Sequence, residues 1–294
     1  MWFPLASLAL AMLVVRRTVE KDLSGKVDSL ALSWLQQVCA LPFIFVTLFF
    51  ARFYWPGELS AKFWLWTVVY SLCCAVDLYV YFKVLSMADL SYVAPLLSLV
   101  AVTTIIGSMV ILHQKPSLIG MSGAVLVVVG ATLVHRGKQK LHESHTQDRR
   151  VLLLILGLIV LRAFFANIEL WPLRESNSTT FNFYTSLLAA PMLLLIAYVL
   201  RRQQAQQYWS EIRGKVRMYI YPLVFIGVTY TANLTATYQA KLLSPTAGYV
   251  TAVKSAQVVP MVLIGAWFFR EKITRQQWYG VGVITAGLLA LAFG

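Results

Sequence analysis

Charged side chains inside long apolar runs are the residues of this sequence that could do chemistry. Asp77, Arg162, Glu169 and Lys254 each lie well within such a run. An ionisable group at the centre of a membrane helix costs about 2.5–3.5 kcal/mol on insertion scales, so it needs a partner or a water-filled cavity. We therefore predict that Lys254 faces a central cavity and binds a negatively charged group of a solute, assisted by Arg162.

Lys254 has a second interpretation that the sequence leaves open. It would form an ion pair with Asp77 or Glu169 that only holds helices together, although a buried ion pair is a poor source of stability. In that case Lys254 is a structural residue without a role in solute binding. A carrier of cations is a further alternative: it would bind its solute through Asp77 or Glu169, with Lys254 as the internal competitor.

Uncharged polar residues at helical spacing extend this candidate site. Tyr81 follows Asp77 by one helical turn, and further polar stripes accompany Lys254 on its own run and on the run before it. Together with the four charged residues, the candidate substrate-binding residues are Tyr81, Tyr230, Asn233, Tyr249, Thr251 and Gln257.

The composition places these residues in a membrane protein. The chain has 294 residues, of which 59% are hydrophobic and only 13% are charged, and its mean hydropathy is +0.69. A soluble chain averages about 25% charged residues. The apolar residues are consecutive rather than alternating, which favours spanning helices over spanning strands. The predicted all-α integral membrane protein has ten spans, at about 2–17, 29–51, 62–82, 90–112, 117–135, 151–172, 178–200, 217–237, 244–269 and 275–293.

The second half of the sequence repeats the first. An offset of 157 positions places Tyr81 on Tyr238 and aligns roughly fifty residues without a gap. Such a repeat decides the fold class before any local feature does. We expect a first repeat at 1–135, a polar basic linker at 136–150 and a second repeat at 151–294.

Glycines in the last helix of each half support the repeat. Gly123 and Gly130 align with Gly280 and Gly287, and each pair is seven residues apart on one helix face. Small residues on one face allow another helix to approach closely, so we predict tight packing there.

Five helices per half is an odd number, so the two repeats would be inverted with respect to each other. Inverted repeats build transporters whose substrate site lies between the halves near the membrane midplane. The repeat is therefore evidence about function as well as fold.

Basic residues predict the orientation. The loops that would face one side hold 17 of them, including Arg16 and Arg17, and the opposite loops hold five, including Lys241. Positively charged loops face the cytoplasm, which places the linker inside and both termini outside.

The stretch Lys83 to Pro95 (KVLSMADLSYVAP) and the charged break Arg270 to Lys272 (REK) precede glycine-marked helices. With the two halves, they resemble the EamA-type ten-helix carriers of the drug/metabolite transporter superfamily. The resemblance implies transport of a small metabolite, amino acid, drug or sugar derivative. This chain departs from the family pattern at Gln114, where glutamate is usual, and in its termini, which family members commonly keep in the cytoplasm.

The sequence thus predicts a secondary active transporter of the inner cell membrane that moves a small organic metabolite, favoured to be anionic, by alternating access. The alternatives are an exporter of cationic or zwitterionic compounds such as amino acids or drugs, and a membrane scaffold subunit without transport. We expect no enzyme activity, cofactor, metal or nucleic-acid partner, despite the net charge of +13. Expected partners are the solute, membrane lipid and a coupling proton or other ion, for a monomer or homodimer.

Overall fold

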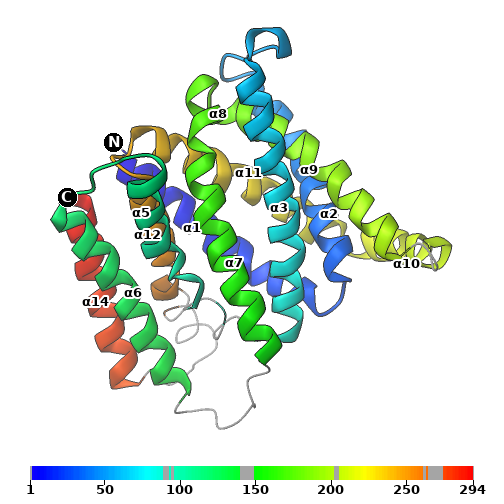
Figure 1. Ribbon diagram of the computed structural model, residues 1–294. Helices are drawn as coiled ribbons and strands as arrows, with labels where there is room; N and C mark the ends of the chain where they lie inside the picture. The colour runs from blue at the N-terminus through cyan, green and yellow to red at the C-terminus, as the bar shows by residue number, and fades with distance from the viewer. Residues whose placement is uncertain are drawn as a thin grey trace.

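The computed structural model describes residues 2–88, 93, 96–139, 149–201, 205–260, 263 and 274–293 as a bundle of helices (Figure 1). No strand occurs among these residues. The elements are α1 (Trp2–Ser24), α2 (Ser29–Leu48), the 3-10 turn η1 (Pro56–Glu58), α3 (Ala61–Met87), α5 (Val100–Ile111), α6 (Leu118–Gln139), α7 (Arg149–Ile168), α8 (Leu170–Glu175), α9 (Ser178–Arg201), α10 (Ala205–Met218), α11 (Ile220–Leu243), α12 (Ala247–Ser255) and α14 (Arg275–Phe293).

Several helices are long and apolar enough to cross a membrane. Among the described residues there are five of them, and two shorter apolar helices lie at Val100–Ile111 and Leu118–Val134. The result confirms an all-helical membrane protein, whereas the number of ten spans stays a prediction. The five are Trp2–Ser24, Ser29–Phe50, Ala61–Met87, Arg149–Glu175 and Ser178–Leu200.

Some predicted features fall outside the described residues. They include most of the Lys83–Pro95 motif beyond position 88, linker positions 140–148, positions 264–269 of the predicted ninth span, and the break Arg270–Lys272.

The first helix is longer than the sequence suggested. We expected a span ending near residue 17, with Arg16 and Arg17 in a loop, but α1 continues to Ser24 and leaves these side chains only 8% and 6% exposed. The helix can continue because Glu20, one turn further, pairs with Arg16. Lys241 was also assigned to a loop, and it is buried in the last turn of α11.

A further helix, α10, occupies the segment expected to be a basic loop between the seventh and eighth spans. Its last turn carries Lys215 and Arg217. Elsewhere on the helix, Ile212 is buried and Trp209 packs edge-on against Trp34 of α2, with ring centroids 5.8 Å apart. The segment is thus an amphipathic helix held against the bundle.

Local signals explain where several helices begin. Asp28 accepts hydrogen bonds from the N–H groups of Leu30 and Ala31 at the start of α2. Ser60 does the same for Phe63 at the start of α3, at 3.1 Å. Such caps satisfy N–H groups that have no partner within the helix.

The paired glycines pack as predicted, because helices α6 and α14 contact each other along the face that carries them. A Cβ atom on Gly123 would lie 2.8 Å from the carbonyl oxygen of Gly287, and one on Gly130 would lie 2.7 Å from that of Gly280. The earlier glycine of one helix meets the later glycine of the other. The two helices therefore run antiparallel, with their backbones in contact.

The packing between the halves is reciprocal. Helix α1 packs on α11 as α7 packs on α3, and α2 packs on α11 as α9 packs on α3. Helix α1 contacts α12 as α7 contacts α5. Equivalent helices also meet one another: α2 meets α9, α5 meets α12 and α6 meets α14. Both chain ends lie at the same end of the bundle (Figure 1).

The outer surface of the bundle is apolar. Leu153 and Val160 of α7 are 66% and 69% exposed, and Leu195 of α9 is 63% exposed. A soluble protein rarely exposes so many large apolar side chains. Lipid contact accounts for them.

Candidate functional site

Buried polar side chains form a seam where α1, α3, α7, α11 and α12 meet, between the two halves of the chain. Around Tyr81 the seam lies against a cluster of buried aliphatic residues that includes Leu78 and Leu85. The residues of the seam are Arg16, Arg17, Glu20, Asp77, Tyr81, Arg162, Glu169, Tyr230, Thr237, Lys241 and Lys254.

Asp77 of α3 and Arg162 of α7 form a two-pronged ion pair that joins the halves. The Nε and Nη2 atoms of Arg162 lie 2.6 Å and 2.9 Å from the two carboxylate oxygens. The side chains are 16% and 11% exposed for Arg162 and Asp77. Arg162 was expected to assist Lys254, and the structure instead engages it with Asp77.

Tyr81 lies between two guanidinium groups. That of Arg17 is 4.7 Å from the centroid of the tyrosine ring, and that of Arg162 is 5.1 Å away. The tyrosine hydroxyl donates to Glu20 at 3.3 Å. Cation–π contacts of this kind hold a guanidinium in place without neutralising its charge.

The two arginines of α1 differ in their partners. The Nε atom of Arg16 lies 2.9 Å from Oε1 of Glu20, and its guanidinium lies 5.0 Å from the ring centroid of Tyr230. Arg17 has no carboxylate partner among the described residues, and its Nε and Nη1 atoms are buried without a hydrogen-bond acceptor. Burial of an unpaired charge is costly.

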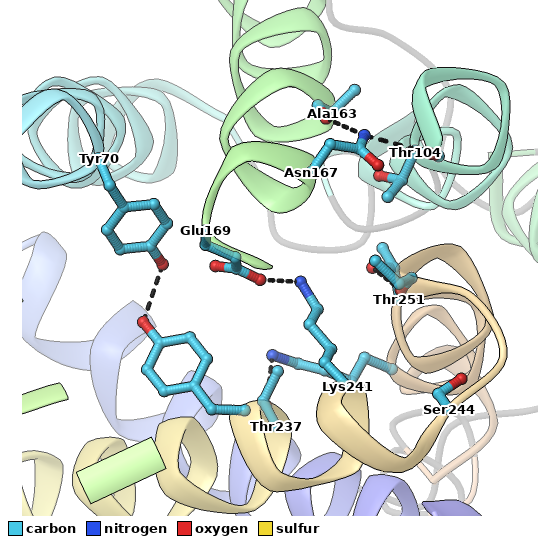
Figure 2. Close-up of polar contacts among 12 residues, drawn as sticks. Tyr70, Thr104, Ala163, Asn167, Glu169, Thr237, Lys241, Ser244 and Thr251 are labelled. Carbon is cyan, nitrogen blue, oxygen red and sulfur yellow. Dashed lines mark hydrogen bonds and ion pairs between the residues drawn. The ribbon is translucent and has the colours of Figure 1, made fainter. Parts of the chain in front are cut away.

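A second charged group lies at the junction of α7 and α8. Glu169 and Lys241 point toward each other and form a buried ion pair (Figure 2). Close by, the hydroxyls of Tyr70 and Tyr238 share a hydrogen bond of 2.8 Å that joins α3 to α11. Asn167, in the last turn of α7, donates to a carbonyl of its own helix and to the carbonyl of Thr104 on α5.

Lys254 of α12 has no carboxylate of its own in the described part of the chain. It is half-buried, and its ammonium group donates to the hydroxyl of Thr237 at 3.1 Å. Asp77 and Glu169, the partners considered from the sequence, are engaged by other cations. The amine of Lys254 therefore has hydrogen-bonding capacity that no carboxylate uses among the described residues.

The remaining candidate residues have mostly structural contacts. Tyr230 accepts a hydrogen bond from Gln37 at 3.0 Å, and Asn233 donates to the carbonyl of Ala9 at 2.6 Å. Tyr249 is fully buried and accepts from the N–H of Ser117 at 2.8 Å, so it packs between helices.

The two other members of the Lys254 stripe differ from each other. Thr251 donates to the carbonyl of Ala247 within α12. Gln257 is buried, and its side-chain oxygen has no hydrogen-bond partner. The predicted polar stripe therefore keeps Lys254 and Gln257 as groups with unused hydrogen-bonding capacity.

The charges of the seam do not balance. The cations exceed the carboxylates by two, since the described residues include Arg16, Arg17, Arg162, Lys241 and Lys254 against Glu20, Asp77 and Glu169. Buried charges are normally paired or face water. By formal charge, the seam thus has an excess of basic side chains that an anion could neutralise.

Five members of the seam were not predicted as site residues: Arg16, Arg17, Glu20, Thr237 and Lys241. The four-residue spacing from Arg16 to Glu20 was the available signal for a continuing helix. Lys241 gave none, because a lysine at the end of an apolar run is also typical of a loop.

Other features of the structure do not belong to the seam. A surface pocket at α3 and α8 shares no residue with it and is lined by Lys62, Phe63, Trp66, Trp171, Pro172 and Glu175. No group of three or more histidine, cysteine or carboxylate side chains suited to a metal occurs among the described residues.

Fold and seam together define a membrane protein of two helical repeats that meet across a polar interface. The sequence profile of the EamA-like transporter family matches residues 1–136 and 149–293. The chain therefore belongs to this family of membrane transporters for small solutes, which is part of the drug/metabolite transporter superfamily.

Comparison with solved structures supports the fold. One, titled only "Crystal structure of protein", is similar over 99% of this chain and 95% of its own, with a TM-score of 0.68 and 12% sequence identity. At that identity the likeness concerns the fold alone. No protein of curated function matches the chain.

Proposed function

We propose that this protein is a secondary active transporter that moves a small organic anion across the cell membrane by alternating access. The observation that carries the proposal is the seam: buried charged groups lie at the interface between the halves rather than at the centre of one helical core. Charges inside a membrane bundle mark solute or ion pathways more often than they supply stability.

The proposed architecture is ten spans in two inverted five-helix repeats, with repeats at 1–135 and 151–294 and the linker 136–150 between them. The reciprocal packing supports this arrangement because the contacts of α1 with α11, α2 with α11 and α1 with α12 have counterparts in those of α7 with α3, α9 with α3 and α7 with α5. The antiparallel contact of α6 with α14 supports a two-fold axis in the membrane plane, since it pairs equivalent helices head to tail.

Alternating access requires contacts that break on one side while they hold on the other. Tyr81 and Tyr238, which align under the repeat, lie near the last turns of α3 and α11. The two helices run in opposite directions, because Tyr238 bonds Tyr70 whereas Tyr230, earlier on α11, lies by Asp77, later on α3. Tyr81 donates to Glu20, and Tyr238 lies by Glu169 and bonds Tyr70. We infer that these two tyrosine–glutamate groups close opposite sides of the pathway.

Lys254 is the proposed contact for the anionic group of the solute. It is half-buried, lies on α12 next to the seam and has only a hydroxyl as its partner among the described residues. Arg162 would join it when the Asp77 pair opens. A proton on Asp77 would open that pair, which would couple solute binding to a proton gradient.

The first experiment identifies a solute and then removes the lysine. Purified protein is screened for thermal stabilisation by organic anions, cations and zwitterions, because a bound solute stabilises the state that it fits. Solutes that stabilise are then tested for uptake into proteoliposomes with the wild type, Lys254→Met and Lys254→Arg. Lys83→Met is the matched control, because Lys83 is an exposed lysine on α3.

We expect Lys254→Met to lose uptake of anions, Lys254→Arg to retain part of it, and the Lys83 variant to behave as wild type. Full uptake by Lys254→Met at equal protein amounts would contradict the role of the lysine. Stabilisation only by cations would favour a cation exporter. A seam whose charges can be replaced together by apolar residues without loss of cellular function would indicate a scaffold.

A further inference from the structure

Arg16 and Arg17 form a pair of buried guanidinium groups at the end of the seam away from Lys241. They are 8% and 6% exposed, and one carboxylate, that of Glu20, contacts the pair among the described residues. It lies against Arg16, while Arg17 contacts the ring of Tyr81 and leaves its Nε and Nη1 atoms without acceptors. The Nη1 atom of Arg16 also has no acceptor.

Structural needs do not explain Arg17. Arg162 and Lys241 each face a carboxylate, so their burial is compensated within the protein. The guanidinium of Arg17 contacts the ring of Tyr81, and its buried Nε and Nη1 donors have no hydrogen-bond acceptor. A guanidinium held in this way presents a fork of donors that matches a carboxylate or phosphate group.

We propose that Arg17, with Arg16 beside it, binds an oxyanion, and that the transported solute is a small dianion whose second negative group binds Lys254. Tyr81 fixes the plane of the Arg17 guanidinium through the ring contact at 4.7 Å. Glu20 restrains Arg16, which leaves the free donors of both arginines for the ligand.

Two observations favour a dianion over a monoanion. The first is the charge balance, since the cations of the seam exceed its carboxylates by two. The second is the spacing on α11. Arg16 lies over Tyr230 and Lys254 contacts Thr237, two residues that are two helical turns apart, or about 10 Å along the axis. Long side chains can converge from these positions on the two ends of one small molecule.

The inference rests on the proposed function in one respect, that the bound dianion is the transported solute. Binding itself can be measured without transport. If the protein binds dianions but moves none of them into proteoliposomes, the proposed function fails and the oxyanion site stands. If it transports solutes without using Arg17, the reverse holds.

The test measures saturable thermal stabilisation of the purified full-length protein in detergent. The probes are succinate, glycerol 3-phosphate and inorganic phosphate, each compared with butyrate and chloride at the same ionic strength and pH. The variants are Arg17→Gln, Arg17→Lys, Lys254→Met and the combination of Arg17→Gln with Lys254→Met. Lys83→Gln is the control for loss of one positive charge from an exposed position.

We expect succinate or glycerol 3-phosphate to stabilise the wild type at concentrations at least tenfold lower than butyrate. Arg17→Gln should weaken the apparent affinity for that dianion at least tenfold, Arg17→Lys by less, and Lys83→Gln not at all. Lys254→Met should weaken dianion binding but change butyrate binding little. The combined variant should bind the dianion no better than it binds butyrate.

Stability without ligand separates a binding role from a structural one. Removing an unpaired buried charge should leave the melting temperature of ligand-free Arg17→Gln equal to that of the wild type or above it. A fall of several degrees in this variant, but not in Lys83→Gln, would overturn the proposal in favour of a structural arginine. So would wild-type affinity of Arg17→Gln for the dianion, or the absence of saturable stabilisation by all three probes.

Discussion

The ion pair between Asp77 and Arg162 gives the sharpest energetic prediction. In Asp77→Asn the guanidinium of Arg162 stays buried without its counter-charge. Breaking a buried pair costs about 3–5 kcal/mol. Because the two side chains are 11% and 16% exposed, we expect the lower end, about 3 kcal/mol. A loss of this size corresponds to about 6–12 °C in melting temperature, from about 2–4 °C per kcal/mol for a chain of this size class.

The assay is thermal unfolding of the purified protein followed by tryptophan fluorescence. Asp22→Asn is the matched control, because Asp22 pairs with Lys26 at the surface with side chains 64% and 45% exposed. Such a pair contributes less than about 1 kcal/mol. We therefore expect a clear fall in melting temperature for Asp77→Asn and almost none for Asp22→Asn.

The combination of Asp77→Leu with Arg162→Met completes the test. Replacing both partners of a buried pair by apolar residues is often neutral or stabilising. The double variant should therefore melt close to the wild type, even though we expect it to lose transport. Equal shifts in Asp77→Asn and Asp22→Asn would refute the reasoning, and so would a double variant whose loss equals the sum of its two single losses.

Three further predictions concern topology and packing. In a cysteine-free background, His142→Cys should resist a membrane-impermeant thiol reagent in intact cells, because the linker is predicted to be cytoplasmic; ready labelling would reverse the orientation. Gly130→Leu should lower the melting temperature strongly and Gly157→Leu weakly, since a Cβ at Gly130 would lie 2.7 Å from a backbone oxygen and nothing lies within 4 Å of one at Gly157. Tyr70→Phe should cost about 1 kcal/mol by leaving the Tyr238 hydroxyl without its partner, and an unchanged melting temperature would contradict that.

Tight packing on the glycine faces of α6 and α14 could be predicted from the sequence, because it depends on features that are local and repeated. The glycines share one face at a fixed spacing in both halves, and only small residues allow two backbones to touch. The alignment did not tell which helix each glycine face would meet. The structure places Gly123 against Gly287 and Gly130 against Gly280.

The depth of charged residues could not be predicted in the same way. A charge after an apolar run is compatible both with a loop and with a helix that continues into a buried seam. Arg16 and Lys241 show the ambiguity: both were assigned to loops, and both are buried with carboxylate partners from Glu20 and Glu169. The carboxylate of Glu169 lies 72 positions away from its lysine in sequence, so hydropathy carries no information about it.

Which cation of the seam meets which carboxylate also depends on how each helix is rotated about its axis. That rotation cannot be predicted from the sequence of one helix alone. Arg162 was grouped with Lys254 because both are deep cations on polar stripes. In the structure, the rotation of α7 turns Arg162 toward Asp77 of α3, and Lys254 meets Thr237. The residue types of the site were therefore predictable, whereas their pairing required the packed bundle.

Some buried cations of the seam have a carboxylate partner and others have none, and this difference is expected of a transport pathway rather than of a structural core. A bundle that only had to hold its helices together would gain stability from losing Lys254 and Arg17, since neither has a carboxylate partner among the described residues. It would keep Arg162 and Lys241, whose charges are compensated. Buried groups that break the rules of stable packing without a compensating contact are expected at functional sites. Replacing Lys254 or Arg17 should therefore affect stability and activity in opposite directions. We expect a protein that is more stable but no longer binds its anion.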